Sequence, residues 1–293
     1  FGLPLLATRD ENGKFRVFAN VCRHRNTIVE QEKCGKKKNF SCPFHAWTYS
    51  SSGKLIGVPK AAHFGEIDRS RFGLAEYPAA EKYGMLWVHP VQGAALDIDA
   101  LLTEVLASEF DSWGFGDLRL MGTDTFEMPL NWKLAVDTFG ETYHFTALHK
   151  NTLAMSFYGN VQGYDTYGRN HRMTLCKKEI DELRNQPESA WDVTVGANPN
   201  YYLFPNVQVN IGPRKIAITV RTYPDPKEVT RSISRIGFYA PQDLAEMAAD
   251  PLKQGMQFFA NVIRDEDYVA AASSQVGASS GATDFVTFGR NEP

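Results

Sequence analysis

Two short cysteine–histidine pairs constrain this chain more than any other feature of its sequence. One residue separates Cys22 from His24, and two residues separate Cys42 from His45, 17 residues further on. Thiolates with imidazoles suit either zinc or an iron–sulfur cluster, so the ligand types alone leave both open. Zinc modules more often space paired ligands two to four residues apart. The order of residues therefore favours a [2Fe–2S] cluster in which one iron takes both thiolates and the other both imidazoles.

The region that carries both pairs has the pattern of short strands joined by tight turns. The alternating segment FRVFAN follows the turn signal at residues 10–13, a second turn signal spans 50–53, and the strand-like MLWVHP ends at residue 90. We therefore expect a small all-β domain over residues 1–90. The sequence opens inside a strand-like segment and without Met, so we expect the natural chain to begin earlier.

The composition is that of a globular protein without an unusual partner. It has 43% hydrophobic and 22% charged residues and a net charge of −3, which gives no bias towards nucleic acid or an anionic membrane. No run approaches the ~18 apolar residues of a membrane helix, and the start lacks a signal-peptide pattern. A cytoplasmic location is the expectation. Cys34 and Cys176 have no partner pattern and are interpreted as ordinary thiols.

The remaining residues predict a larger domain that combines a sheet with helices. Residues 91–115 are interpreted as a connection with a helix over 98–108, and a domain over 116–293 begins with a strand at 119–128. Segments 201–211, 215–223 and 231–240 are strand-like and suggest an antiparallel sheet. A helical stretch from 241 to about 275, interrupted at Pro251 and Gly255, is expected to pack across it. The fold class is therefore α+β.

A second group of candidate metal ligands lies in this larger domain. Apolar spacing predicts a helix over 130–149 that carries His144 and His149. Five residues of a regular helix leave two side chains ~140° apart, so the helix must end or distort, most simply near residues 145–148. Two imidazoles and one carboxylate on one face of Fe(II) are typical of non-haem iron oxygenases. Asp265, Glu266 and Asp267 are the candidates for that carboxylate.

The motifs together resemble one family. CRHR followed by CPFHAWTYSSSGKLIGVP resembles the Rieske module of ring-hydroxylating oxygenases, and Asn-Trp-Lys with Tyr-His-x4-His resembles the second signature of their alpha (oxygenase) subunits. Phe44 stands where respiratory Rieske proteins have a disulfide cysteine, which favours the oxygenase branch. Asn26 replaces the family's usual Gly, and the turn can survive because Asn tolerates positive φ.

The resemblance implies a set of ligands and a fold. Cys22, His24, Cys42 and His45 would hold the [2Fe–2S] cluster. His144 and His149 would bind the Fe(II) together with Asp267, because Glu266-Asp267-x7-Gln275 matches the family's third-ligand segment. The larger domain would have the family's helix-grip form, an antiparallel sheet with long helices.

The resemblance also implies an electron path and a reaction. A reductase, with or without a ferredoxin, would pass electrons from NAD(P)H to the cluster, and Glu141 would link that cluster to the iron of a neighbouring subunit in a homotrimer. A small beta subunit is compatible with this assembly. The iron would then activate O2 to hydroxylate or dihydroxylate a small aromatic substrate. Asp137 and Thr138 occupy positions where the family commonly has Glu-Asn.

Three other interpretations remain open at this point. Glu at position 141 resembles the branch that acts on quaternary ammonium compounds and related methyl groups, so a monooxygenase or demethylase is one. A non-catalytic Rieske electron carrier and a structural zinc protein are the others. The basic loop formed by Lys33, Lys36, Lys37 and Lys38 is either a solvated surface or a docking site for an acidic electron-transfer partner.

Overall fold

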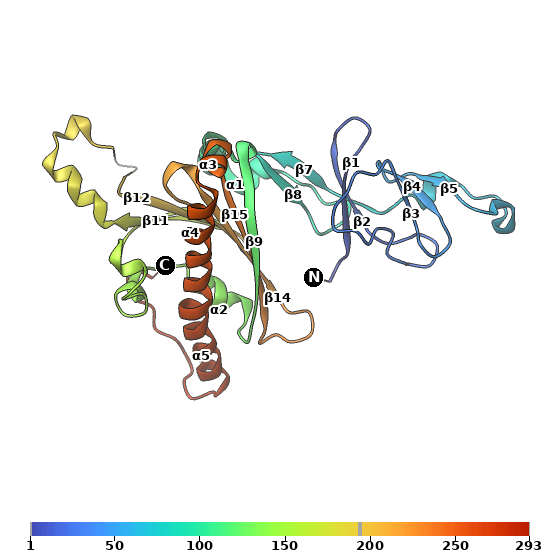
Figure 1. Ribbon diagram of the computed structural model, residues 1–293. Helices are drawn as coiled ribbons and strands as arrows, with labels where there is room; N and C mark the ends of the chain where they lie inside the picture. The colour runs from blue at the N-terminus through green and yellow to red at the C-terminus, as the bar shows by residue number, and fades with distance from the viewer. Residues whose placement is uncertain (1, 193–194, 293) are drawn as a thin grey trace. The chain divides into compact units, whose positions relative to one another are not determined.

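The structure is a computed structural model that describes residues 2–192 and 195–292. It confirms the predicted α+β class, and the chain divides into two compact units, Phe1–Ala100 and Leu101–Pro293 (Figure 1). The first unit is built of strands and the second combines a large sheet with helices. The division falls within the first α-helix, α1 (Ile98–Trp113). Each unit is described separately below.

The first unit consists of short antiparallel strands, as its sequence predicts. In the described residues they form the sheets β1-β2-β6, β3-β4-β5 and β7-β8. The strands are β1 (Leu5–Arg9), β2 (Phe15–Ala19), β3 (Asn39–Ser41), β4 (Thr48–Ser50), β5 (Leu55–Gly57), β6 (Glu76–Tyr77), β7 (Ala79–Lys82) and β8 (Met85–Val88). Two single 3-10 turns, Ala61–Phe64 and Arg69–Phe72, lie between β5 and β6.

The core of the first unit surrounds both candidate cysteines. Cys22 and Cys42 are buried in one apolar cluster with Phe18, Trp47 and Tyr49. Gly53, in the predicted turn before β5, has φ +78°, and a Cβ there would lie 2.4 Å from the Phe18 ring. Both observations require glycine at this position, because positive φ strains other residues and the ring leaves no space. This turn fixes the hairpin that follows Cys42.

The second unit is built on one antiparallel sheet in the order β10-β11-β12-β13-β14-β15-β9. Its strands are β9 (Leu118–Met128), β10 (Phe157–Tyr167), β11 (Asn170–Lys177), β12 (Ala197–Leu203), β13 (Val207–Ile211), β14 (Ala217–Pro224) and β15 (Ser232–Pro241). Its other elements are α2 (Trp132–Asp137), α3 (Gln242–Met247), α4 (Ala249–Val262), a π-helical turn (Ile263–Asp267), α5 (Tyr268–Ser279) and 3-10 turns at 115–117, 143–146, 153–155, 178–185, 188–190 and 213–215.

The sequence predicted only part of this sheet. The strands expected at 119–128, 215–223 and 231–240 correspond to β9, β14 and β15. The segment 201–211 is two strands, β12 and β13, because the chain turns between Leu203 and Val207. Strands β10 and β11 were not predicted. Their 11 and 8 residues mix polar and apolar positions with little alternation, which hides a period of two.

The late helical stretch is interrupted at places other than those predicted. Pro251 and Gly255 both lie inside α4, and the interruptions are Ala248, between α3 and α4, and the π-helical turn at 263–267. Pro251 is tolerated because it lies in the first turn of α4, where backbone N–H groups have no partner within the helix. The helix predicted at 98–108 extends to Trp113 and contains a non-helical residue, Thr103.

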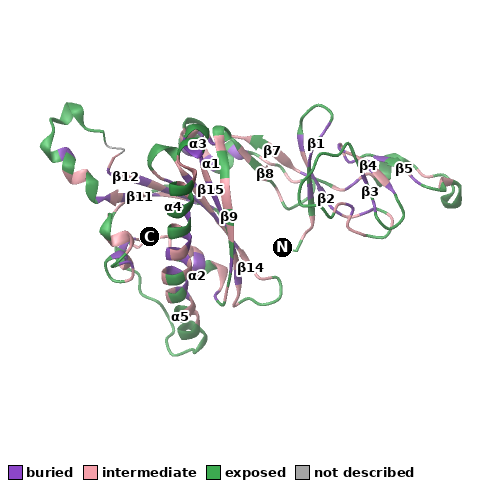
Figure 2. Ribbon diagram, in the orientation of Figure 1, coloured by how far each residue is buried: buried purple, intermediate pink, exposed green. Residues whose placement is uncertain are grey.

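Helices α4 and α5 lie along the large sheet (Figure 1). Their buried residues recur at helical spacing, and Met256, Ala260, Ile263 and Tyr268 pack with strand residues such as Ile236. Figure 2 shows the opposite side of these helices as mostly exposed. The helix pair is therefore held against the sheet along one apolar stripe, and the π-helical turn lies in the middle of it. Among the described residues, no helix is long and apolar enough to cross a membrane.

Candidate metal centres and active site

The two cysteine–histidine loops of the first unit have the same backbone geometry. In each loop the cysteine N–H donates to the carbonyl five residues later, and the N–H four residues later donates back to the cysteine carbonyl. The four bonds are Cys22 to Thr27 at 2.8 Å, Asn26 to Cys22 at 2.9 Å, Cys42 to Trp47 at 2.8 Å and Ala46 to Cys42 at 2.9 Å. The two loops are thus a matched pair although their cysteine–histidine spacings differ.

Both loops close through a residue with positive φ. Asn26 has φ 57° and Ala46 has φ 55°, at equivalent positions four residues after the cysteine. The expectation that Asn26 adopts positive φ in place of the family's glycine is confirmed. Ala46 was not singled out from the sequence. Positive φ costs more free energy at Ala46 than at Asn26, because alanine has no side-chain oxygen to stabilise the left-handed conformation.

The loops place thiols inside and imidazoles outside. Cys22 and Cys42 are 1% and 3% exposed, whereas His24 is half-buried and His45 is exposed. The two imidazole rings approach to 4.6 Å between centroids. His24 Nδ1 is buried and has no hydrogen-bond partner among the described residues, which leaves a ring nitrogen free for a metal. Buried sulfur donors and converging imidazoles from two loops fit a [2Fe–2S] cluster with its histidine side towards solvent.

The tyrosine after the second loop contacts one candidate ligand directly. The Tyr49 hydroxyl lies 3.3 Å from Cys22 Sγ and accepts a hydrogen bond from the Arg23 N–H at 3.0 Å. Because its oxygen is occupied as an acceptor, the hydroxyl is oriented to donate to the sulfur. Burial, together with the neighbouring Cys22, raises the pKa of Tyr49. A donor to a ligating sulfur stabilises the reduced cluster and raises its potential.

In the second unit, the predicted helix over 130–149 is wrong in its length. Helix α2 ends at Asp137, His144 lies in the 3-10 turn Tyr143–Thr146, and His149 follows that turn. The chain therefore leaves the helix before the first histidine rather than between the two. The tight turn continues with bonds from the Leu148 N–H to the His144 carbonyl at 2.8 Å and from the His149 N–H to Phe145 at 3.1 Å. These bonds bring both imidazoles to one side.

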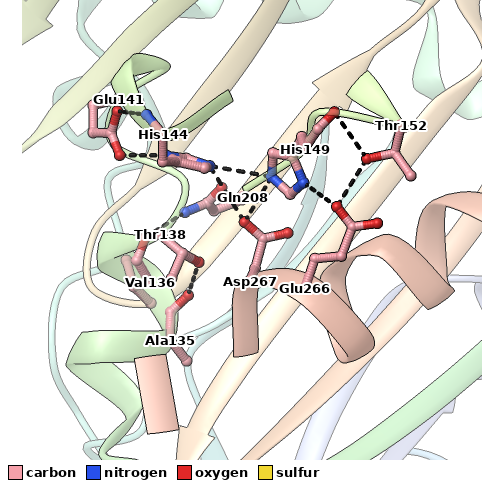
Figure 3. Close-up of polar contacts among 10 residues, drawn as sticks. All are labelled: Ala135, Val136, Thr138, Glu141, His144, His149, Thr152, Gln208, Glu266 and Asp267. Atoms are coloured by element: carbon pink, nitrogen blue, oxygen red, sulfur yellow. Dashed lines mark hydrogen bonds and ion pairs between the residues drawn. The ribbon is translucent and has the colours of Figure 1, made fainter. Parts of the chain in front are cut away.

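The structure brings His144, His149 and Asp267 together. The two Nε2 atoms are 3.2 Å apart, and Asp267 Oδ1 lies 3.1 Å from His149 Nε2 and 3.4 Å from His144 Nε2 (Figure 3). Two ligands at right angles on a metal with ~2.1 Å bonds are ~3.0 Å apart, so these edges match one face of an octahedron. His149 and Asp267 are buried and His144 is partly buried. The arrangement fits a single metal ion bound on one face.

A carboxylate holds the second nitrogen of each imidazole. His144 Nδ1 donates to Glu141, whose other oxygen accepts from the His144 N–H at 3.1 Å. His149 Nδ1 donates to Glu266 Oε2 at 2.7 Å, and the Thr152 hydroxyl donates to the same oxygen at 2.8 Å. A carboxylate can only accept, so each Nδ1 carries the proton and each Nε2 is left to bind a metal.

The three neighbouring acids that the sequence left open therefore occupy different positions. Asp267 lies with the two histidines, Glu266 lies behind His149, and Asp265 is exposed and pairs with Arg264 at 2.6 Å. Glu266 and Asp267 can reach two sides of the same imidazole because they are consecutive residues of the π-helical turn. Such turns inside α-helices often occur at functional sites, but no residue pattern in the sequence announced this one.

The site attracts positive charge. Burial lowers the pKa of His144, but hydrogen bonds to Asp267 and Glu141 outweigh it and raise that pKa to about 9. At His149 burial again lowers the pKa, but Asp267 and Glu266 outweigh the burial, and the pKa is raised. Carboxylates that favour a proton on these imidazoles also favour a metal cation at the same place, so the electrostatics agree with the geometry.

A cavity extends from the candidate iron site to the sheet. Its walls are mostly apolar, with Phe139 and Phe145 near the histidines and Phe259 and Ile263 from the helices. Asn200, Gln208 and Asn210 are polar side chains that line it from the sheet. The sequence analysis missed these three amides, although their alternate positions in two short strands were a readable signal. Thr138, which occupies the position of a family asparagine, also lines the cavity.

Comparison with known families assigns both units. Residues 1–78 match the family described as Rieske [2Fe-2S] domain. Residues 115–293 match the family described as ring hydroxylating alpha subunit (catalytic domain). The first unit thus contains a Rieske domain, and the chain belongs to the ring hydroxylating alpha subunit family.

The curated relatives include both dioxygenases and monooxygenases. The chain is 31% identical over 149 residues to chlorobenzene dioxygenase subunit alpha of Cupriavidus sp., a match that covers 48% of this chain and 32% of the relative. It is 25% identical over 283 residues to the carnitine monooxygenase oxygenase subunit of Acinetobacter baumannii, which covers 95% of this chain and 73% of the relative. Several matched relatives, including the first of these, are covered over only about a third of their length.

Solved structures share the fold. A quaternary ammonium Rieske monooxygenase in complex with an inhibitor superposes with a TM-score of 0.81 at 21% identity, covering 96% of this chain and 73% of that one. Naphthalene 1,2-dioxygenase from Rhodococcus sp. bound to indole gives a TM-score of 0.73 at 17% identity, covering 94% and 72%. At these identities the likeness establishes the architecture, including the large antiparallel sheet with its helices.

Proposed function

We propose that this chain is the oxygenase component of a Rieske non-haem iron oxygenase that oxidises a small organic molecule with O2. Cys22, His24, Cys42 and His45 bind the [2Fe–2S] cluster, and His144, His149 and Asp267 bind Fe(II). The observation that carries the proposal is the triangle of three metal-ligand atoms at 3.1–3.4 Å beside an apolar cavity. A mere electron carrier has no need of that cavity.

Each residue around the triangle has a definable task. Bound Fe(II) supplies the redox chemistry that activates O2. Glu141 and Glu266 hold the Nδ1 protons, which keeps both Nε2 atoms aimed at one point. His144, His149 and Asp267 would hold the iron from one side, which would leave its cavity side for O2 and substrate. The apolar walls of Phe139, Phe145 and Phe259 bind the substrate and exclude water.

Electrons start from NAD(P)H and reach the cluster through a reductase, with or without a ferredoxin. Glu141 then couples the cluster of one subunit to the iron site of the next in a homotrimer. Its contact with His144 is consistent with one half of that role, because a carboxylate with two oxygens can accept from a second imidazole. A monomer in solution that retains full single-turnover activity would remove both the trimer and this role of Glu141.

Two reaction types follow from the relatives' names. Chlorobenzene dioxygenase supports hydroxylation or dihydroxylation of an aromatic ring, whereas carnitine monooxygenase and N,N-dimethyl phenylurea N-demethylase support monooxygenation or demethylation. We favour an aromatic substrate because the cavity walls are largely apolar. Demethylation of an N- or O-methyl group carried by such a ring compound is the second candidate, and detection of formaldehyde separates the two.

Metal content and oxygen uptake test the proposal together. We expect about three irons per chain, two in the cluster and one at the triangle, with the visible absorption of an iron–sulfur centre. A chemical reductant should support O2 uptake that rises when a substrate is added. A chain with about two irons and no substrate-dependent uptake would be an electron carrier, and a colourless zinc-containing chain would be a structural protein. Either result overturns the proposal.

A further inference from the structure

The cavity beside the candidate iron ligands has a stripe of amides in its sheet wall, within a mostly apolar surface. Hydrogen-bonded partners across the sheet form a row from β11 to β14, in which Met173 faces Asn200, Asn200 faces Asn210, and Asn210 faces Ile218. Directly opposed residues of an antiparallel sheet share a face. Asn200 and Gln208 are only 8% and 5% exposed. Buried amides between apolar strands are costly unless they have partners, so their contacts are informative.

A backbone carbonyl fixes the orientation of the first two amides. Gln208 Nε2 donates to the Val136 carbonyl at 3.2 Å (Figure 3). A carbonyl can only accept, so the Gln208 nitrogen must lie on that side and Oε1 must face the other way. Asn200 Nδ2 donates to Gln208 Oε1 at 3.4 Å, and the reverse orientation of Asn200 would oppose two oxygens. The choice between oxygen and nitrogen at Asn200 is therefore dictated by its surroundings.

This orientation leaves the Asn200 carbonyl oxygen for the cavity. Among the described residues, Asn200 Oδ1 has no hydrogen-bond partner, and the atom is not fully buried. Asn200 lines the cavity, so that oxygen is reachable from it. The adjacent Asn210 is paired with Asn198 at 3.2 Å. No described backbone group anchors either side chain, so this second pair can reverse. Of the three amides described in the lining, Asn200 alone presents a fixed acceptor.

The charges around the cavity agree with this polarity. Of the described residues that line it, none is Lys or Arg, whereas Glu141 and Asp267 are carboxylates. A carboxylate on a substrate would meet a fixed acceptor and no Lys or Arg side chain in the lining. A substrate N–H or O–H group would instead satisfy the acceptor, and a site built to hydrogen-bond such a group discriminates strongly against analogues without it.

We propose that Asn200, held in orientation by Gln208, is the specificity-determining residue of this cavity and accepts a hydrogen bond from an N–H or O–H group of a neutral aromatic substrate. The proposal rests on the proposed function, since it assigns a substrate class to the same site. It excludes aromatic carboxylates as preferred substrates. The open volume is only about 50 Å³, less than one aromatic ring fills, so the probes are the smallest aromatics, single-ring compounds, and their binding requires cavity side chains to move.

Binding of three similar probes tests the proposal without turnover. Aniline, toluene and benzoate each have one aromatic ring. Aniline adds an N–H donor, toluene adds neither a donor nor a charge, and benzoate adds a negative charge. Calorimetric titration of the iron-loaded chain under argon at pH 8 should give aniline a Kd at least about tenfold below that of toluene, with benzoate the weakest. Benzoate binding as tightly as aniline, or toluene binding as tightly as aniline, overturns the proposal with no variant needed.

Two matched variants locate the effect. Asn200→Leu should remove the preference for aniline over toluene and leave the toluene Kd within about threefold, because leucine preserves the volume but offers no acceptor. Asn198→Leu lies on the same strand and face, outside the cavity lining. It removes the partner of Asn210 but leaves the contacts of Asn200 and Gln208 unchanged, so it should keep the preference. An aniline preference that survives Asn200→Leu overturns the proposal.

Failure here is distinguishable from failure of the proposed function. A chain that prefers aniline but consumes no O2 supports the role of Asn200 and removes the oxygenase. A chain that consumes O2 with benzoate and binds benzoate best supports the oxygenase and removes the role of Asn200.

Discussion

The two candidate metal centres are assembled in different ways. The four candidate cluster ligands lie within residues 22–45, on two loops with the same pair of backbone hydrogen bonds. The candidate iron ligands are separated by most of the second unit, since His144 and His149 lie before β10 and Asp267 lies after α4. The first centre is fixed by local chain geometry, whereas the second depends on the packing of a helix against a turn. In the part of the chain that the structure describes, carboxylates that hold candidate ligand imidazoles, Glu141 and Glu266, occur only at the second centre.

The largest expected effect is loss of the locally built centre. In Cys42→Ser the cluster loses a thiolate ligand, and we expect the visible absorption and about two of the three irons to disappear while the third iron remains. Iron analysis and absorption spectra of the purified variant measure both. Cys176→Ser is the matched control, because that thiol lies in the sheet of the second unit and should keep all iron. If Cys42→Ser keeps its colour, the assignment of the cluster is wrong.

The next-largest effect should be loss of the candidate iron site with the cluster retained. Asp267→Ala should lose one iron and substrate-dependent O2 uptake, because two imidazoles alone leave the ion without its carboxylate. The cluster absorption should be unchanged. Asp265→Ala removes an exposed carboxylate two residues away and should change neither quantity. Equal losses in both variants would mean that the late acidic segment acts by folding rather than by ligation.

The difference between the centres also explains what the sequence could predict. The first centre was readable because its ligands, its turn at Gly53 and the positive φ of Asn26 all lie within one short stretch. The strands around it alternate visibly between apolar and polar residues. Their type could therefore be assigned from local pattern alone, as it could for β9, β14 and β15 in the second unit.

The second centre was readable only in part. The two histidines were evident, but the helix predicted through them ends at Asp137. The predicted helix was too long because the apolar spacing continues past the point where the chain turns. The distinct positions of Glu266 and Asp267 depend on a π-helical turn that tertiary packing stabilises. The acceptor at Asn200 depends on a carbonyl from α2, far away in sequence. Contacts of this kind leave no local pattern.

A smaller effect should come from the carboxylate behind His149. Glu266→Gln keeps the shape but removes the charge that holds Nδ1, so iron affinity should fall about 10- to 100-fold while the cluster is retained. Titration of the iron-depleted protein with Fe(II) under argon measures this. Thr152→Val removes the hydroxyl that donates to Glu266 and, at 3.3 Å, to the His149 carbonyl, and it should weaken iron binding by less because the carboxylate remains. An unchanged affinity in Glu266→Gln would show that His149 is oriented by its surroundings without help from Glu266.

The smallest effect tests whether the two matched loops carry equal strain. Ala46→Gly should stabilise the protein by up to about 1 kcal/mol, because glycine adopts positive φ without the steric cost that alanine meets. Asn26→Gly should stabilise it by less, since asparagine already tolerates the same φ. Free energies of unfolding by urea measure both, with cluster absorption as the signal. Equal gains would mean that Asn26 is as strained as Ala46, and that its side chain contributes nothing to closing the first loop.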